Sequence, residues 1–129
     1  MTGIYDAVRD RLLANQALTD IIGENNVWEE RLPADAVIPS LAIRTPGGVK
    51  PNVESPVEDE TLHVDGWFKY LTTAKQAEAQ IISSLDGVRA LLDDSNLFRL
   101  DRETTGRVWE GDTRLWHLIV TYSCIFIRR

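Results

Sequence analysis

The last long segment of the sequence, residues 112–127, constrains the fold most, because apolar side chains occupy both of its alternating faces. A period of two with many β-branched and aromatic residues predicts one long β-strand rather than a helix. Such a strand is a poor edge to leave in water, so we expect it at the centre of a sheet or inside an assembly. One face consists of Trp116, Leu118, Val120, Tyr122, Cys124 and Phe126, and the other of Leu115, His117, Ile119, Thr121, Ser123, Ile125 and Ile127.

Length and composition predict a single domain over residues 1–129. The formal charge of -6, from 20 acidic and 14 basic residues, argues against a general nucleic-acid-binding surface. The single cysteine excludes an internal disulfide framework. No apolar run is long enough to cross a membrane and no secretory signal is visible, so we expect the protein to work in the cytoplasm where it is made, without a membrane partner.

The remaining segments predict helices packed around a small sheet. Apolar spacing and two caps, Asn15 at a helix start and Gly23 at its end, indicate a pair of N-terminal helices. We therefore expect an α+β fold, in which an antiparallel sheet of about four strands has two or three helices packed on one face. The expected order is helices over residues 3–14 and 16–22, strands over 40–45 and 61–70, a helix over 74–92, and strands over 97–103 and 112–127. Residues 107–110 either continue the strand over 97–103 or form a turn before the last strand.

Residues 46–60 have a different composition from the segments on either side. They include three prolines, two glycines and four acidic residues, with almost no side chain to bury. This pattern predicts a long, flexible, acidic hairpin loop that orders only against a partner.

No motif for catalysis or metal binding is present. His63 and His117 each stand alone on a predicted strand, and Cys124 has no second thiol at zinc-binding spacing. The nucleophile-elbow, phosphate-loop and zinc-protease motifs are missing. We therefore predict that the chain is not an enzyme and has no catalytic, cofactor or metal site. An enzyme that uses either histidine with nearby carboxylates remains an alternative.

The tryptophans are more informative than the titratable residues. Trp67 lies on the polar face of its predicted strand, and Trp109 lies between charged residues. Large aromatic side chains on polar faces are typical of subunit interfaces. We predict a subunit interface that contains both tryptophans together with Ile119 and Ile125, from the second face of the C-terminal strand.

Several short motifs follow one another in a fixed order along nearly the whole chain. They are Leu18-Thr19-Asp20-Ile21-Ile22-Gly23, then Val27-Trp28, Arg31-Leu32-Pro33, Ile38-Pro39-Ser40-Leu41-Ala42-Ile43 and Val64-Asp65-Gly66-Trp67. A long helix and a long final strand come after them. This order and spacing resembles that of the tail-completion proteins of long-tailed bacteriophages, the family that includes tail terminators and head-to-tail joining proteins.

The resemblance implies an α+β subunit that forms a ring, typically a hexamer, at the neck of a virion assembled in the cytoplasm of a host bacterium. Such a ring ends the tail tube and joins it to the head connector. Its partners would be sister copies, tail tube protein and head-completion protein. DNA would pass through the bore without specific binding, which suits a negatively charged protein. On this basis we expect the acidic loop to lie near the bore or an axial interface, through Glu54, Glu58, Asp59 and Glu60.

A second function is also compatible with the sequence. The chain could be a monomeric minor tail or head-completion module that binds a ring built by other proteins. The sequence does not distinguish a terminator from a joining protein, and it does not fix the ring size.

Overall fold

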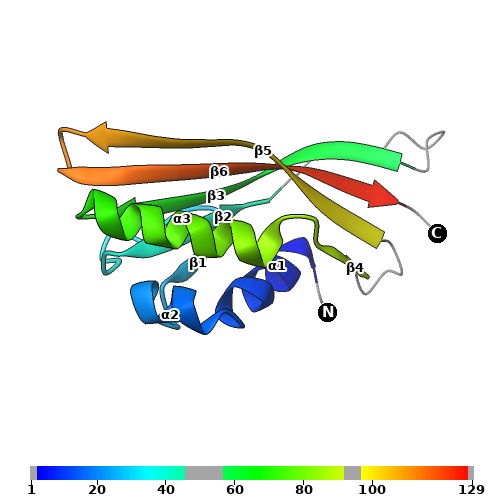
Figure 1. Ribbon diagram of the computed structural model, residues 1–129, viewed down its shortest axis with the longest axis horizontal. Helices are drawn as coiled ribbons and strands as arrows, with labels where there is room; N and C mark the ends of the chain where they lie inside the picture. Colours follow the sequence, from blue (N-terminus) through cyan, green and yellow to red (C-terminus); the bar gives the residue numbers. More distant parts are fainter. Residues whose placement is uncertain (1–2, 46–56, 92–96, 128–129) are drawn as a thin grey trace.

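The computed structural model places its helices on one side of a single twisted sheet (Figure 1). It describes residues 3–45, 57–91 and 97–127. The sheet has six strands in the order β1-β2-β3-β6-β5-β4. Along the chain the elements are α1 (Ile4–Leu13), α2 (Gln16–Ile22), β1 (Val27–Glu29), β2 (Ser40–Arg44), β3 (Val57–Phe68), α3 (Leu71–Leu85), β4 (Arg89–Leu91), β5 (Leu97–Glu110) and β6 (Leu115–Ile127).

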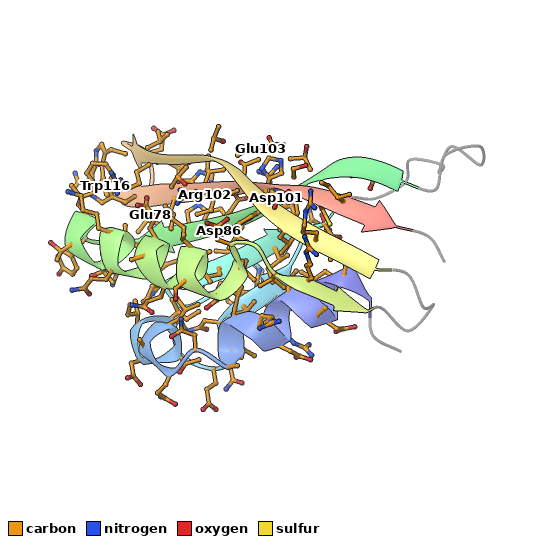
Figure 2. The ribbon with its side chains drawn as sticks, turned by 45° about the vertical axis from the view of Figure 1, so that its right-hand side comes forward. Glu78, Asp86, Asp101, Arg102, Glu103 and Trp116 are labelled. Carbon is orange, nitrogen blue, oxygen red and sulfur yellow. The ribbon has the colours of Figure 1, made fainter. Side chains whose placement is uncertain are left out.

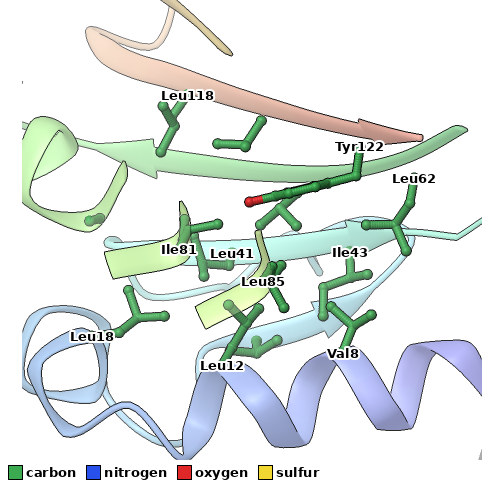
Figure 3. Packing of buried hydrophobic residues seen from close by; sticks show 14 of the residues in the cluster. Val8, Leu12, Leu18, Leu41, Ile43, Leu62, Ile81, Leu85, Leu118 and Tyr122 are labelled. Atoms are coloured by element: carbon green, nitrogen blue, oxygen red, sulfur yellow. The ribbon is translucent and has the colours of Figure 1, made fainter. Parts of the chain in front are cut away.

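The C-terminal strand β6 lies at the centre of this sheet, as its sequence predicts. It pairs antiparallel with β3 on one side and with β5 on the other, along nearly its whole length. Its helix-side face is completely buried in the middle of the strand (Figure 3). The buried side chains there are Leu118, Val120, Tyr122 and Cys124.

Three helices supply the other half of the core (Figure 3). Asn15 fixes the helix pair as the sequence predicts, because its side-chain oxygen accepts a hydrogen bond from the backbone N–H of Leu18 at 3.2 Å. The amide nitrogen of Asn15 also donates to the Ser84 hydroxyl at 2.9 Å, which ties α2 to α3. The helical side chains in the core are Val8, Leu12, Leu18, Ile22, Ala74, Ala77, Ile81 and Leu85.

The α+β class and the one-sided helix layer are confirmed, but the sheet is larger than expected. Six strands replace about four, and β1 runs parallel to β2. β5 extends to Glu110, so residues 107–110 continue the strand rather than form a turn, and residues 104–106 belong to it as well. The predicted helix over residues 74–92 is wrong at its end: α3 stops at Leu85, because Gly87 takes a left-handed φ of 72° and turns the chain back to form β4.

The predicted loop over residues 46–60 is wrong in its last four positions. β3 begins at Val57, and Glu60 pairs with Cys124 of β6. The long β6 strand accounts for this extension, because its backbone groups need a partner along their full length. Residues 46–56 lie outside the described part of the chain.

The two glycines that lie within long strands allow a matched stability test. A Cβ on Gly66 would lie 2.6 Å from Cε2 of Phe68 and 2.9 Å from Cδ2 of Leu41, whereas a Cβ on Gly106 meets nothing within 4 Å. We expect Gly66→Ala to lower the unfolding free energy by about 1–3 kcal/mol, because the core has no room for the methyl group. Gly106→Ala should be neutral or stabilising by up to about 1 kcal/mol. Urea denaturation of the two variants measures both effects, and equal values for both would contradict the packing described for Gly66.

Candidate functional site

The candidate site is the face of the sheet opposite the helices, which we call the open face. No described helix covers it (Figure 1). Alternation along the paired strands defines its members. They include Arg44 of β2, His63, Asp65 and Trp67 of β3, Leu115, His117, Ile119, Thr121, Ser123 and Ile125 of β6, and Arg99, Asp101, Thr104, Gly106, Val108 and Glu110 of β5.

A half-buried ion pair anchors one end of the open face. Nε of Arg44 donates to Oδ2 of Asp65 at 2.6 Å, and the Asp65 side chain is only 5% exposed, while the Arg44 side chain is 45% exposed. Nε2 of His117 lies 3.6 Å from Oδ1 of Asp65, which is longer than a hydrogen bond. Burial raises the pKa of Asp65, but the neighbouring His117 and Arg44 side chains lower it by more, so the pKa lies below its ordinary value of 3.8. Asp65 is therefore a charged group that its partners stabilise inside the fold.

The aromatic groups beside this ion pair are held in place. The rings of Trp67 and His117 stack with centroids 4.7 Å apart and planes 14° from parallel. Nδ1 of His117 lies 3.8 Å from a carboxylate oxygen of Glu110. Trp67 therefore presents a flat apolar surface whose orientation is fixed before any partner binds.

The second histidine of the open face has a different environment. Nδ1 of His63 lies 3.2 Å from the hydroxyl oxygen of Thr121. Partial burial, together with the positive charge of Arg44, lowers the pKa of His63 below its ordinary value of 6.5. His63 is thus neutral at physiological pH, and its hydrogen bond links β3 to β6.

A pocket of about 550 Å³ opens on the same end of this face. Residues 30–38 fold over the end of the sheet and form one wall, while β2, β3 and β6 form its floor. Its lining comprises Glu30, Arg31, Leu32, Ile38, Arg44, Asp65, Trp67, Thr113, Leu115 and His117. The pocket combines apolar walls with ionised groups that are already paired or balanced, as is usual in binding sites.

The structure brings three of the four predicted interface residues onto one face. Trp67, Ile119 and Ile125 lie on the open face, and each is partly buried. Trp109 lies on the other face, where its ring is 5.4 Å from that of Trp116 and 47% of the residue is exposed. Figure 2 shows Trp116 at the end of the sheet formed by the β5–β6 hairpin.

The four acidic residues predicted to line a bore are not seen as a cluster. Glu60 lies in β3 and is partly buried. Glu58 and Asp59 belong to the same strand, but their side chains are not described, and Glu54 lies outside the described residues. Their placement near a bore stays a prediction.

Sequence reasoning missed the Arg44–Asp65 pair. On β3 itself the nearest candidate partner of Asp65 on the same face is His63, two positions away. The structure instead joins Asp65 to side chains on the two neighbouring strands, Arg44 of β2 and His117 of β6. Cross-strand partners depend on register, and register cannot be read from residues on a single strand.

The described residues of the open face offer surfaces for contact. Among the described residues no group of three or more His, Cys, Asp or Glu side chains could hold a metal ion. No described helix is long and apolar enough to cross a membrane. What the face does offer is a fixed aromatic surface, a pocket and a row of aliphatic and hydroxyl side chains.

Comparisons with known proteins agree with this picture. The family model described as "Tail completion protein gp17" matches residues 6–127. The solved structure "Virion of native gene transfer agent (GTA) particle" contains a chain of the same fold, with a TM-score of 0.78, 13% sequence identity, and coverage of 96% of this chain and 94% of that one. At that identity the likeness concerns the fold. No curated protein matches the sequence.

Replacing Asp65 by asparagine tests the half-buried ion pair. We expect Asp65→Asn to lower the unfolding free energy at neutral pH by about 1–3 kcal/mol, because the charged hydrogen bond of a buried carboxylate is lost. Asp101→Asn is the matched control, since Asp101 pairs with Arg99 at 3.0 Å but has a side chain that is 46% exposed. The control should change stability by less than about 1 kcal/mol in the same urea titration.

The same pair predicts a pH dependence with a definite sign. The folded-state pKa of Asp65 is lowered, so its stabilising contribution is complete above the ordinary value of 3.8. The contribution is lost as the pH falls below that value through the folded-state pKa. The stability difference between the wild type and Asp65→Asn should therefore shrink in acid. A difference that stays constant to the lowest pH at which both proteins fold would contradict this assignment.

Proposed function

The chain belongs to the tail completion protein gp17 family and is thus a structural protein of a phage-type tail, and from this premise we propose that its copies close into a ring at the head–tail junction. The ring, expected to be a hexamer, ends the tail tube on one side and offers a surface to the head connector on the other. Its neighbours in the virion neck are then tail tube protein and head-completion protein.

The observation that carries this proposal is the open face. In a two-layer fold, helices bury one side of the sheet. When the second side is also partly apolar, it is expected to pack against another protein surface. Here that side presents Trp67, Ile119 and Ile125 without a helix above them. Sister copies are the simplest cover, because most oligomers of soluble proteins are built from identical chains.

DNA passes through the bore of this ring without being bound specifically. The net charge of -6 supports this part of the proposal, since acidic surfaces repel phosphates. We assign Glu54, Glu58, Asp59 and Glu60 to the bore or to an axial interface. A cross-linking map that places residues 54–60 on the outer rim would contradict the assignment.

Particles made without this protein test the proposed role directly. Tails of excessive length indicate a terminator, because nothing then stops the polymerisation of the tube. Tails of normal length that carry no heads indicate a joining protein. Complete particles in normal yield would contradict both roles, and the length distribution and head attachment can be measured by negative-stain electron microscopy.

A charge on the open face should prevent the ring from closing. We expect Ile119→Glu to shift the purified protein from closed oligomers to monomers in native mass spectrometry, because a carboxylate would be buried without a partner at the interface. Ala17→Glu, at an exposed position of α2, is the control and should leave the oligomer unchanged. Unfolding curves establish that both variants remain folded. A wild-type chain that is monomeric both in solution and on cross-linked tails would favour the monomeric interaction module instead.

A further inference from the structure

We infer that in the assembled ring the indole of Trp109 from one copy occupies the pocket on the open face of the next copy. This inference rests on the proposed self-assembly and names the residues that carry it. It follows from the shape and charge of the pocket, from the exposure of Trp109, and from the positions of the two on the molecule.

The pocket suits a single large neutral side chain. Its volume of about 550 Å³ lies within the usual range for binding pockets and is large enough for an indole ring. Its ionised lining groups are two carboxylates, from Glu30 and Asp65, and two guanidinium groups, from Arg31 and Arg44. These charges balance, so the pocket has no net attraction for a free anion or cation. Apolar walls from Leu32, Ile38 and Leu115 can cover an aromatic ring.

Trp109 is a large apolar side chain that the single chain leaves half uncovered. Of its surface, 47% is exposed, and the ring of Trp116, tilted by 56°, supports the buried side. The indole is therefore held in one orientation and loses little conformational freedom on binding. Tryptophan is also the residue type most enriched among the dominant contacts of interfaces.

The other large apolar side chains that are exposed in the described part of the chain fit the pocket less well. Val108 lies on the open face itself, opposite His117. Val37 belongs to the same 30–38 segment that forms the pocket wall. Tyr70 is 70% exposed and can keep its hydroxyl in water, so it gains less from burial.

Position on the molecule supports the same pairing. Trp109 and Trp116 lie opposite each other on the helix-covered face, while Leu115 and His117, on either side of Trp116, line the pocket on the open face. The projecting side chain and the pocket are thus at the same end of the sheet but on opposite faces. A contact between two different surfaces is heterologous, and repeated heterologous contacts form a ring when the rotation between copies closes and an open filament when it does not.

Cysteine cross-linking on purified tails tests the contact. The double variant Arg107→Cys/Leu32→Cys keeps the Trp109 indole and places its first thiol two positions away on the same face. It should give a ladder of covalent oligomers with a short bismaleimide, because the two positions lie on opposite faces of one chain but meet between chains. Either single variant should give none. Ala17→Cys/Leu32→Cys is the matched control and should also give none, and the native Cys124 is buried and should not react.

A quantitative measurement accompanies the cross-linking. Trp109→Ala should weaken ring formation roughly 30-fold or more, the effect of a dominant interface residue. Tyr70→Ala, which removes an even more exposed aromatic ring, should change it by about twofold or less.

The outcomes separate this inference from the proposed function. Rings that form normally but give no ladder, or that tolerate Trp109→Ala within twofold, would overturn the inference and leave the ring proposal standing. The absence of rings in solution and on tails, together with normal tails in particles that lack the protein, would overturn both.

Discussion

The fold depends on β6 being buried on one face and hydrogen-bonded along both edges. Four successive inward side chains of this strand are fully buried, and of these Leu118 and Val120 each contribute about 1.5–3 kcal/mol of hydrophobic stabilisation. Pairing along both edges requires two neighbours of similar length, which explains why β3 and β5 extend across the whole molecule. The helices pack on this sheet because they bury the apolar face of β6 and its neighbours, which would otherwise be exposed to water.

The same arrangement leaves the open face with a mixed character. Hydroxyl groups and the Arg44–Asp65 pair satisfy much of its polar surface, so a single copy can exist in water. The Trp67–His117 stack and the partly exposed isoleucines supply the apolar contacts that a partner would use. Interfaces that form after folding have this composition, with apolar anchors inside a polar surround. A subunit that is made first and assembled later needs both properties.

The sequence predicted the parts of this structure that depend on local chemistry. Alternation placed β6, and Asn15 and Gly23 placed the start and the end of the second helix. Parts that depend on distant partners were missed. Residues 57–60 were predicted as loop because their side chains are mostly acidic, and they form a strand only by pairing with β6. Residues 89–91 were predicted as helix, and they form a strand only by pairing with β5. The pocket could not be predicted, because it depends on the cross-strand register and on the path of residues 30–38. Neither of these has a local signature in the sequence.

One irregularity decides how the two interface elements are arranged. The register between β5 and β6 shifts between Arg102 and Thr104, so β5 contains one residue more than β6 at that point. Before the shift Asp101 lies on the open face, and in an unbroken strand every second residue after it, including Trp109, would lie there too. The bulge moves Trp109 to the opposite face from Trp67. Trp109 and Trp67 on the same face would form a self-complementary patch, which favours a two-fold dimer. With the bulge, Trp109 projects from one face and the pocket lies on the other, which is the arrangement that a closed ring requires.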